Sequence, residues 1–166
     1  MMMPLPHLSS FSMSEVIKIV FLDFDGVFTD NSVYIDEMGL EHVRCSRYDG
    51  YGISSLINNG IMVHVITSES RPLAKHRCKK LGIPLSFGVP DKIKEANVVC
   101  ESLELNLSVA CYMGNDINDL GLLRSVIFPI VTADCHASLR NPSFYTTQSK
   151  GGYGCIRELS DFLVPC

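Results

Sequence analysis

The chain has 166 residues, of which 46% are hydrophobic and 19% charged, and its formal net charge is −4. This length and composition indicate one globular domain with its own core, and they exclude an intrinsically disordered chain. The apolar runs fall short of the ~20 residues that a membrane span needs, and the acidic balance without a long Lys/Arg cluster argues against membrane or nucleic acid partners.

The start of the chain and its cysteines point to a cytoplasmic protein. Residues 1–15 lack the basic start and the long apolar stretch of a secretory signal, so a loose leader is expected there, with Met13 as a candidate start. Residues 16–166 are then expected to form a single domain. The seven cysteines include no CxxC pair and lie mostly inside apolar segments. They indicate free thiols in a reducing cytosol, in preference to a disulfide framework or a zinc site.

The predicted elements begin with a buried strand and a hairpin. Ile17–Leu22 is nearly all apolar and rich in β-branched residues, as a strand buried on both faces should be. Residues 33–35 and 41–45 predict two short strands, and the turn between them contains Gly39, which accepts a positive φ. A small antiparallel hairpin is therefore expected after the first strand.

Helices and strands alternate through the rest of the chain. Pro72 lies near the start of a predicted helix that runs to Leu81 and ends at Gly82. Asp91 can cap a second helix over residues 92–103. Apolar runs and periodicity predict the remaining elements, which are helices over 52–59, 117–124 and 153–163 and strands over 61–66, 109–113, 127–131 and, more weakly, 144–147.

This alternation predicts an α/β fold, in which a parallel sheet carries helices on both faces. Ligands of such sheets bind beyond the carboxyl ends of the strands. Polar residues from three predicted strands stand at that edge, and a lysine begins a helix that can reach it. These residues are Asp23, Asp25, Thr67, Ser68, Asn115, Asp116 and Lys92.

The two carboxylates of the stretch FLDFDGVFTD need a chemical reason to lie so close together. Asp23 and Asp25 would repel each other unless a cation neutralised them, and oxygen ligands suit Mg²⁺. Thr67 and Lys92, at a strand end and a helix start, could hold a phosphoryl group. We therefore expect Asp23 to attack phosphorus and form an aspartyl-phosphate, with Asp25 as general acid and then general base.

Each of these residues also has a duller explanation. An aspartate after a strand is usually a turn residue or a helix cap, and Thr67 could cap the next helix. Lys92 could be a solvated surface lysine, and Asp119 a helix-face charge in a first turn. The catalytic interpretation is favoured because such groups stand together at consecutive strand ends.

The ordered motifs DFDGV, VITS, a lone lysine and GNDIND resemble those of the haloacid dehalogenase (HAD) superfamily over residues 17–164. Within it the chain resembles the small cap-less phosphatases of 3-deoxy-octulosonate 8-phosphate and of nine-carbon sialic-acid-type sugars. The stretches DGVFTD, RYDGYGI at 47–53 and GGYGCIRE at 151–158 carry this resemblance. Phosphatase-like domains of sialic acid cytidylyltransferases are similar too.

The resemblance implies a Rossmann-like, doubly wound parallel sheet with a small β-hairpin insertion and no large cap domain. It implies a Mg²⁺-dependent hydrolase of a small-molecule sugar phosphate. It also implies a homotetramer in which hairpins pack together and a neighbour covers each site. The alternative is a non-catalytic oligomerisation or regulatory domain beside a sialic acid cytidylyltransferase. Loss of Asp23, Asp25 or Lys92 would favour that alternative, and all three are present.

One departure from the family pattern concerns the substrate. After VIT the eight-carbon-sugar enzymes usually have Gly-Arg, whereas this chain has Ser68-Glu69. Glu69 resembles the nine-carbon branch, as do Arg77 and Lys80 on the next helix. These residues, with Arg47 as a further candidate, are expected to contact the substrate. A nine-carbon 9-phosphate is therefore the favoured substrate, with octulosonate 8-phosphate next.

The other departure concerns the metal. The usual GDDxxD motif is GNDIND here, so Asn115 replaces the first carboxylate. Asn115 still offers a neutral oxygen. The expected Mg²⁺ ligands are nevertheless Asp23, Asp25, through its backbone carbonyl, and Asp116.

Overall fold

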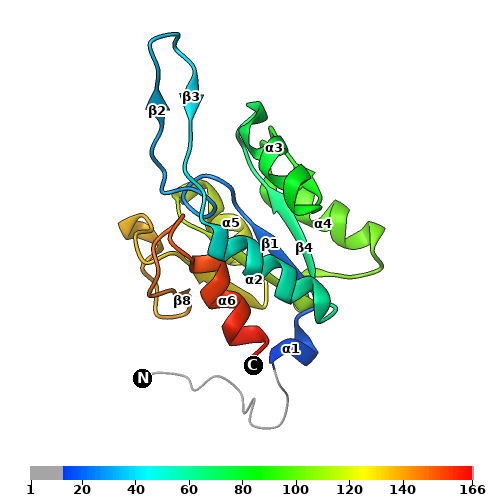
Figure 1. Ribbon diagram of the computed structural model, residues 1–166. Helices are drawn as coiled ribbons and strands as arrows, with labels where there is room; N and C mark the ends of the chain where they lie inside the picture. Colours follow the sequence, from blue (N-terminus) through cyan, green and yellow to red (C-terminus); the bar gives the residue numbers. More distant parts are fainter. Residues whose placement is uncertain (1–12, 166) are drawn as a thin grey trace.

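A computed structural model describes residues 13–165 and forms an α/β fold around one parallel sheet (Figure 1). The strands are β1 (Ile19–Leu22), β4 (Met62–Ile66), β5 (Leu85–Ser86), β6 (Ala110–Gly114), β7 (Phe128–Val131) and β8 (Tyr145–Thr146). They lie in the order β5-β4-β1-β6-β7-β8, and every neighbouring pair is parallel. The predicted fold class is confirmed, and β1 lies inside the sheet.

Helices cover both faces of this sheet. One face carries α2 (Arg47–Asn58), α3 (Pro72–Leu81) and α6 (Cys155–Leu163), and the other carries α4 (Lys92–Ser102) and α5 (Leu120–Leu123). In Figure 1 α2 and α6 lie side by side on the near face of the sheet. The short helices are α1 (Met13–Val16), η1 (Leu107–Val109), η2 (Ile117–Asp119) and η3 (Ala137–Leu139).

The predicted hairpin is present and projects away from the sheet (Figure 1). It consists of β2 (Tyr34–Ile35) and β3 (Glu41–His42), and Gly39 in its turn has a φ of 77°. Residues 13–165 contain no larger insertion between β1 and α2. The apolar side chains of the hairpin are exposed, namely Val33, Tyr34, Ile35, Met38 and Leu40.

Helix α2 begins at Arg47 rather than at the predicted residue 52. The hydroxyl of Ser46 accepts a hydrogen bond from the Tyr48 N–H and caps the helix. Gly52, the first residue of the predicted helix, lies inside α2 and is needed for packing. A Cβ at Gly52 would lie 2.8 Å from the Cα of Arg157 in α6, so only glycine allows the two helices to approach so closely.

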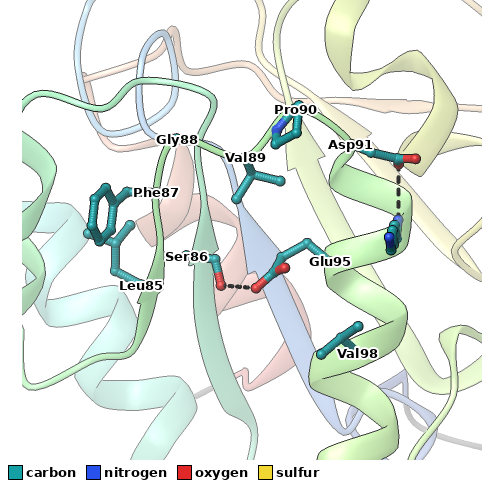
Figure 2. Close-up of a pocket in the computed structure, with 10 residues that line it drawn as sticks. Leu85, Ser86, Phe87, Gly88, Val89, Pro90, Asp91, Glu95 and Val98 are labelled. Atoms are coloured by element: carbon teal, nitrogen blue, oxygen red, sulfur yellow. Dashed lines mark hydrogen bonds between the residues drawn. The ribbon is translucent and has the colours of Figure 1, made fainter.

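Strand β5 was not predicted, because only two residues of it pair with β4. Its Ser86 hydroxyl lies 2.6 Å from a Glu95 carboxylate oxygen and 2.9 Å from Nε2 of His64. A cavity of about 470 Å³ opens between β5 and α4 (Figure 2). None of the predicted site residues lines that cavity.

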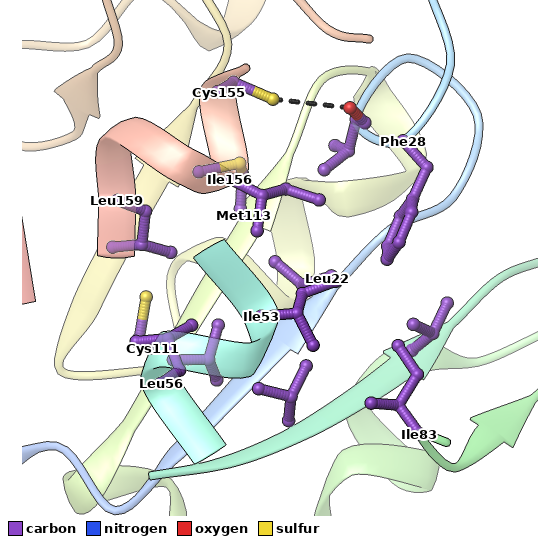
Figure 3. Close-up of a cluster of buried hydrophobic side chains, with 14 of the residues drawn as sticks. Leu22, Phe28, Ile53, Leu56, Ile83, Cys111, Met113, Cys155, Ile156 and Leu159 are labelled. Carbon is purple, nitrogen blue, oxygen red and sulfur yellow. Dashed lines mark hydrogen bonds between the residues drawn. The ribbon is translucent and has the colours of Figure 1, made fainter. Parts of the chain in front are cut away.

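The apolar core lies in two layers, one on each face of the sheet. On one face Leu22 of β1 and Met113 of β6 pack with Ile53 and Leu56 of α2 and Leu159 of α6 (Figure 3). Full burial of each such side chain stabilises the fold by ~1.5–3 kcal/mol. The opposite layer includes Ile19, Phe21, Ala96, Val99, Tyr112 and Leu122.

Other expectations concern thiols, membrane spans and the leader. Six cysteines within residues 13–165 are free thiols, as predicted, and Cys166 lies outside the described part. No helix in the described part is long and apolar enough to cross a membrane. The predicted loose leader covers residues 1–15; residues 1–12 lie outside the described part, and α1 (Met13–Val16) includes the last three residues of this leader.

Candidate active site

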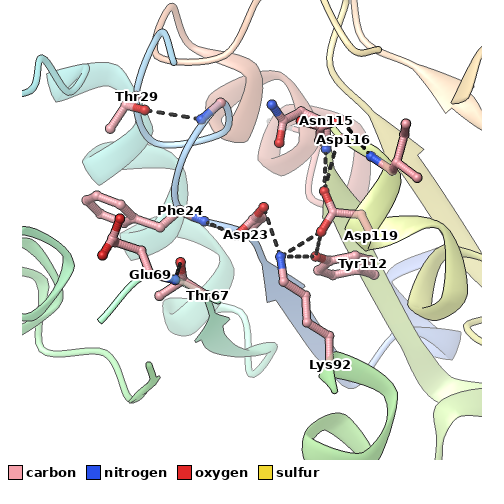
Figure 4. Close-up of polar contacts among 12 residues, drawn as sticks. Asp23, Phe24, Thr29, Thr67, Glu69, Lys92, Tyr112, Asn115, Asp116 and Asp119 are labelled. Carbon is pink, nitrogen blue, oxygen red and sulfur yellow. Dashed lines mark hydrogen bonds and ion pairs between the residues drawn. The ribbon is translucent and has the colours of Figure 1, made fainter. Parts of the chain in front are cut away.

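Three loops meet at the carboxyl ends of β4, β1 and β6 because these strands are direct neighbours. Asp23 follows β1, Thr67 follows β4 and Asn115 follows β6. Lys92 is the first residue of α4, which reaches the same edge, as Figure 4 shows. The predicted convergence of these strand ends is therefore present in the fold.

Asp23 and Lys92 form a buried ion pair at the centre of this cluster. The Nζ atom of Lys92 lies 2.9 Å from Oδ2 of Asp23 and 2.6 Å from Oδ1 of Asp119. The other oxygen of Asp23 accepts a hydrogen bond of 2.7 Å from the Phe24 N–H. Asp23 and Lys92 are each 5% exposed and Asp119 is inaccessible, so Lys92 is no surface lysine.

The electrostatics of the site follow from burial and close charges. Burial and the charge of Asp119 raise the pKa of Asp23 to about 7, against the opposing effect of Lys92. Burial lowers the pKa of Lys92, but the two carboxylates outweigh burial and raise it. Lys92 therefore stays charged near neutral pH and favours the ionised form of Asp23.

Asp119 holds the loop after β6 in place. Its Oδ2 accepts hydrogen bonds from the N–H groups of Asn115, at 2.8 Å, and Asp116, at 3.1 Å. Its Oδ1 lies 2.5 Å from the hydroxyl of Tyr112. Asp119 is thus buried and fully bonded, and its interpretation as a helix-face charge is wrong. Sequence reasoning missed Tyr112, which reads as an ordinary apolar strand position.

A cavity of about 290 Å³ opens above Asp23. The hydroxyl of Thr67 accepts from the Glu69 N–H at 3.1 Å, which leaves its own O–H free to donate to a ligand. Burial and the charge of Glu69 raise the pKa of Asp25, which suits a proton donor. Asn118 was missed, although it stands inside the GNDIND motif. The cavity is lined by Asp23, Asp25, Thr67, Ser68, Glu69 and Asn118.

Asn115 and Asp116 differ in a way that bears on metal binding. Asn115 is buried, and its Oδ1 has no hydrogen-bond partner, which is costly for a buried oxygen. Asp116 is exposed and accepts from the Ile117 N–H at 2.7 Å to cap η2, and neither Asn115 nor Asp116 is among the residues that line the cavity.

The oxygen donors present fit Mg²⁺. Within residues 13–165 no three His, Cys, Asp or Glu side chains are grouped to hold a metal ion. A cation at the cavity would therefore rely on the carboxylates of Asp23 and Asp25 together with neutral oxygens. The unpartnered oxygen of Asn115 is one such donor, and this all-oxygen set is the kind that Mg²⁺ prefers.

The predicted substrate residues divide into two groups. Glu69 lines the cavity and forms a 2.7 Å ion pair with Arg71. Arg77 instead donates to the Ser46 carbonyl at 2.9 Å, and Lys80 lies exposed in the last turn of α3. Arg47 is exposed at the start of α2. The single chain therefore does not bring Arg47, Arg77 or Lys80 into the cavity lining, contrary to expectation.

The GGYGCIRE stretch braces the loop that carries Asp25. The Gly152 N–H donates to the Val27 carbonyl at 2.9 Å, and Gly152 has a φ of 69°. A Cβ at Gly151 would lie 2.0 Å from the carbonyl oxygen of Gly26, so glycine is required there.

The RYDGYGI stretch completes this contact from α2. One carboxylate oxygen of Asp49 accepts from the N–H groups of Ile156, at 3.0 Å, and Arg157, at 3.1 Å. Asp49, although distant in sequence, thus accepts hydrogen bonds from backbone N–H groups in the first turn of α6 that have no partner within the helix. The two signature stretches therefore support the site by packing and hydrogen bonds.

The chain and its fold are similar to known phosphatases and hydrolases. No protein-family model matches the chain. It is 32% identical over 149 residues to the 3-deoxy-D-manno-octulosonate 8-phosphate phosphatase of Yersinia pestis, across 89% of the chain and 80% of that relative. The fold is similar to a HAD family hydrolase of Streptomyces avermitilis, with a TM-score of 0.88, 35% identity and coverage of 91% and 87% of the two chains. It is also similar to the 3-deoxy-D-manno-octulosonate 8-phosphate phosphatase of Moraxella catarrhalis, crystallised with magnesium, phosphate and KDO (TM-score 0.86, 29% identity, coverage 92% and 88%).

Proposed function

The chain belongs to the HAD superfamily and, within it, to the cap-less 3-deoxy-D-manno-octulosonate 8-phosphate phosphatase-like family, and on that premise we propose that it works through an aspartyl-phosphate. It is a phosphoric monoester hydrolase of a sugar-acid phosphate. The observation that carries the mechanism is the buried pair of Asp23 and Lys92 below a cavity that Asp25 and Thr67 also line. A domain that serves only assembly or regulation would not need this cluster to border a cavity lined by further carboxylate and hydroxyl groups.

In the first step, a carboxylate oxygen of Asp23 bonds to phosphorus while the bond from phosphorus to the sugar oxygen breaks. Asp25 donates its proton to the departing sugar oxygen, and its raised pKa supports this role. Lys92 and the Thr67 hydroxyl bind phosphoryl oxygens and hold the group for attack.

In the second step, Asp25 is ionised and takes a proton from a water molecule that attacks phosphorus. The bond between Asp23 and phosphorus breaks, which restores the carboxylate and releases inorganic phosphate. Both carboxylic acids thus return to their starting states, and the water supplies the fourth oxygen of the phosphate.

The enzyme uses Mg²⁺, as the magnesium-bound Moraxella relative indicates. We propose that Asp23, the backbone carbonyl of Asp25 and Oδ1 of Asn115 hold the ion. The sequence-based choice was Asp116, but its exposed, helix-capping carboxylate supports that role less well than the buried, unpartnered oxygen of Asn115. When bound, the ion would neutralise carboxylate and phosphate charge.

The identity of the sugar acid rests on fewer residues. Glu69 lines the cavity, which supports a preference for nine-carbon 9-phosphates, because a carboxylate there can accept from sugar hydroxyls or an amide. The Yersinia and Moraxella relatives are named for octulosonate 8-phosphate, which remains the next candidate. The weakened case for Arg77 and Lys80 leaves Glu69 as the main support for the nine-carbon class.

We also propose that the chain assembles as a homotetramer through its hairpins. The support is the exposed apolar surface of Tyr34, Ile35 and Met38, whose exposed fractions are 56%, 67% and 83%. Apolar side chains gathered on a projecting hairpin are typical of a surface that another chain covers.

The test of the substrate class is a panel of kcat/KM values with Mg²⁺ for phosphorylated eight- and nine-carbon keto acids. The proposal expects hydrolysis of sugar-acid phosphates, with the nine-carbon class ahead. Glu69→Arg should lower the ratio of nine- to eight-carbon kcat/KM, whereas Lys79→Ala, an exposed change on α3, should leave it unaltered. An unchanged ratio in Glu69→Arg would remove the support for the nine-carbon assignment.

A further inference from the structure

The amino group of Lys92 has three N–H donors and three acceptors around it. These acceptors are Oδ2 of Asp23 at 2.9 Å, Oδ1 of Asp119 at 2.6 Å and the hydroxyl of Tyr112 at 3.2 Å (Figure 4). An ammonium group can donate one hydrogen bond from each proton, so this set satisfies it completely. Only Asp23 among the three acceptors lines the catalytic cavity.

The other two acceptors form a fixed pair behind Lys92. Tyr112 and Asp119 are both inaccessible to solvent, and the tyrosine oxygen lies 2.5 Å from Oδ1 of Asp119. Burial raises the pKa of Tyr112 well above its usual value, so the hydroxyl keeps its proton. It therefore donates to Asp119 and accepts from Lys92, and neither role can be reversed.

During the reaction, one N–H of Lys92 must change its hydrogen-bond acceptor. While Asp23 attacks phosphorus, the proton that faced its carboxylate is needed by the phosphoryl oxygens. The other two N–H groups must stay hydrogen-bonded to Asp119 and Tyr112, because otherwise the amino group would rotate and its third N–H would no longer point at the phosphoryl group. A core role alone would not require the hydroxyl, since phenylalanine fills the same space.

We propose that Tyr112 is a positioning residue for the phosphatase reaction. Its hydroxyl, together with Asp119, fixes the rotation of the Lys92 amino group so that the third N–H points at Asp23 and the phosphoryl group. This inference rests on the proposed function, because it assigns Lys92 to the phosphoryl group.

The test is Tyr112→Phe, which removes one buried oxygen and keeps the ring. Tyr145→Phe in β8 is the matched control, since it makes the same change at a half-buried position of the same sheet, where the ring stacks on Phe162. The measurements are kcat and KM for p-nitrophenyl phosphate with Mg²⁺, equilibrium binding of inorganic phosphate, and the melting temperature.

Tyr112→Phe should lower kcat by about tenfold and weaken phosphate binding by about fivefold, as expected for one lost hydrogen bond to a charged group. KM should change much less than kcat, and Tyr145→Phe should match the unmodified protein in kcat and phosphate binding. A lower melting temperature with unchanged kcat and phosphate binding in Tyr112→Phe would reduce Tyr112 to a packing residue and overturn the inference.

A double-mutant cycle separates action through Lys92 from any other effect. In a Lys92→Met background, Tyr112→Phe should cause no further loss of phosphate binding, and an equal further loss would contradict the inference. If Lys92→Met does not fold, the kcat and phosphate binding of Tyr112→Phe and Tyr145→Phe still test the role of Tyr112.

Asp23→Asn distinguishes failure of the proposed function from failure of the Tyr112 role. If it keeps normal turnover, the proposed function fails, whereas a dead Asp23→Asn with an unaffected Tyr112→Phe rejects only the role of Tyr112.

Discussion

The amino nitrogen of Lys92 lies 2.9 Å from a carboxylate oxygen of Asp23, and both side chains are almost fully buried. A buried charge is tolerated only with a partner, so each of these residues depends on the other for stability. The same contact points the lysine at the position where a phosphoryl group would meet Asp23. One pair thus links the stability of the fold to the chemistry of the site.

Lys92→Ala should therefore damage both stability and activity. It leaves Asp23 and Asp119 without their cation, and removal of one partner of a buried pair costs ~3–5 kcal/mol. Urea unfolding should show a loss of this order, and kcat should fall by at least two orders of magnitude. Lys94→Ala, which removes an exposed lysine from the same helix, should change neither quantity. Equal stability of the two variants would show that the Lys92 pair does not hold the loops together.

The pH dependence of stability should report on Asp49. Burial raises its pKa to about 6, from an ordinary value of 3.8. A raised pKa means that the contribution of Asp49 to stability is fully present below pH 3.8 and is lost as the pH rises through 6. Asp49→Asn cannot ionise, and its amide oxygen can still accept from the first turn of α6.

The stability of Asp49→Asn relative to the unmodified protein should therefore improve by about 2 kcal/mol between pH 4.5 and 7.5. Urea unfolding at the two pH values measures this difference. Glu101→Gln, at an exposed position of α4, should show no such change. A relative stability of Asp49→Asn that falls with rising pH would refute the raised pKa.

Gly151→Ala should displace the loop that carries Asp25, although Gly151 itself does not line the cavity. Its Cβ would lie 2.0 Å from the carbonyl oxygen of Gly26, in the loop that carries Asp25, so this loop must move. Overpacking of this kind costs ~1–3 kcal/mol, and we expect a lower melting temperature together with a fall in kcat. In Gly50→Ala the new Cβ meets the flexible ends of Leu81 and Arg77 at 3.3 and 3.5 Å, so this control should stay active. Full activity of Gly151→Ala would show that the C-terminal stretch does not support the site.

Much of this arrangement could be predicted from sequence because it depends on local signals. Strand ends follow from apolar runs, and α3 and α4 begin and end where Pro72, Gly82 and Asp91 predicted. Since parallel strands bring their carboxyl ends to one edge, Asp23, Thr67 and Asn115 could be placed together without coordinates.

The failures at Arg77 and Tyr112 depend on contacts between distant segments. Arg77 was expected to contact the substrate because it matches a basic position of the nine-carbon branch, but packing directs it to the Ser46 carbonyl at the start of α2. Tyr112 looked like a core residue because its hydroxyl contacts lie on other elements. The helix was predicted to begin only at Gly52, whereas α2 begins at Arg47, and sequence does not show that α6 crosses α2 at this glycine.

Removal of the metal should abolish turnover without unfolding the chain. EDTA should remove activity, Mg²⁺ should restore it, and the circular dichroism spectrum should stay unchanged, because the core does not depend on the ion. Asn115→Ala should raise the Mg²⁺ concentration needed for half-maximal activity by about tenfold or more. Asp116→Ala should mainly lose the cap of η2, at ~1 kcal/mol. A larger rise in the Mg²⁺ requirement for Asp116→Ala than for Asn115→Ala would show that Asp116 is the metal ligand.

The central claim is that Asp23 carries the phosphoryl group, and a burst experiment on Asp25→Asn tests it most directly. With p-nitrophenyl phosphate the leaving group needs no proton, so this variant should still form the aspartyl-phosphate, but it lacks the base that activates water. Rapid mixing with Mg²⁺ should release about one nitrophenol per site before slow turnover. The label from ³²P-substrate should map to the peptide that contains Asp23, and Asp23→Asn/Asp25→Asn should show neither burst nor label. A burst or protein-bound phosphate that survives in the double variant would contradict the account.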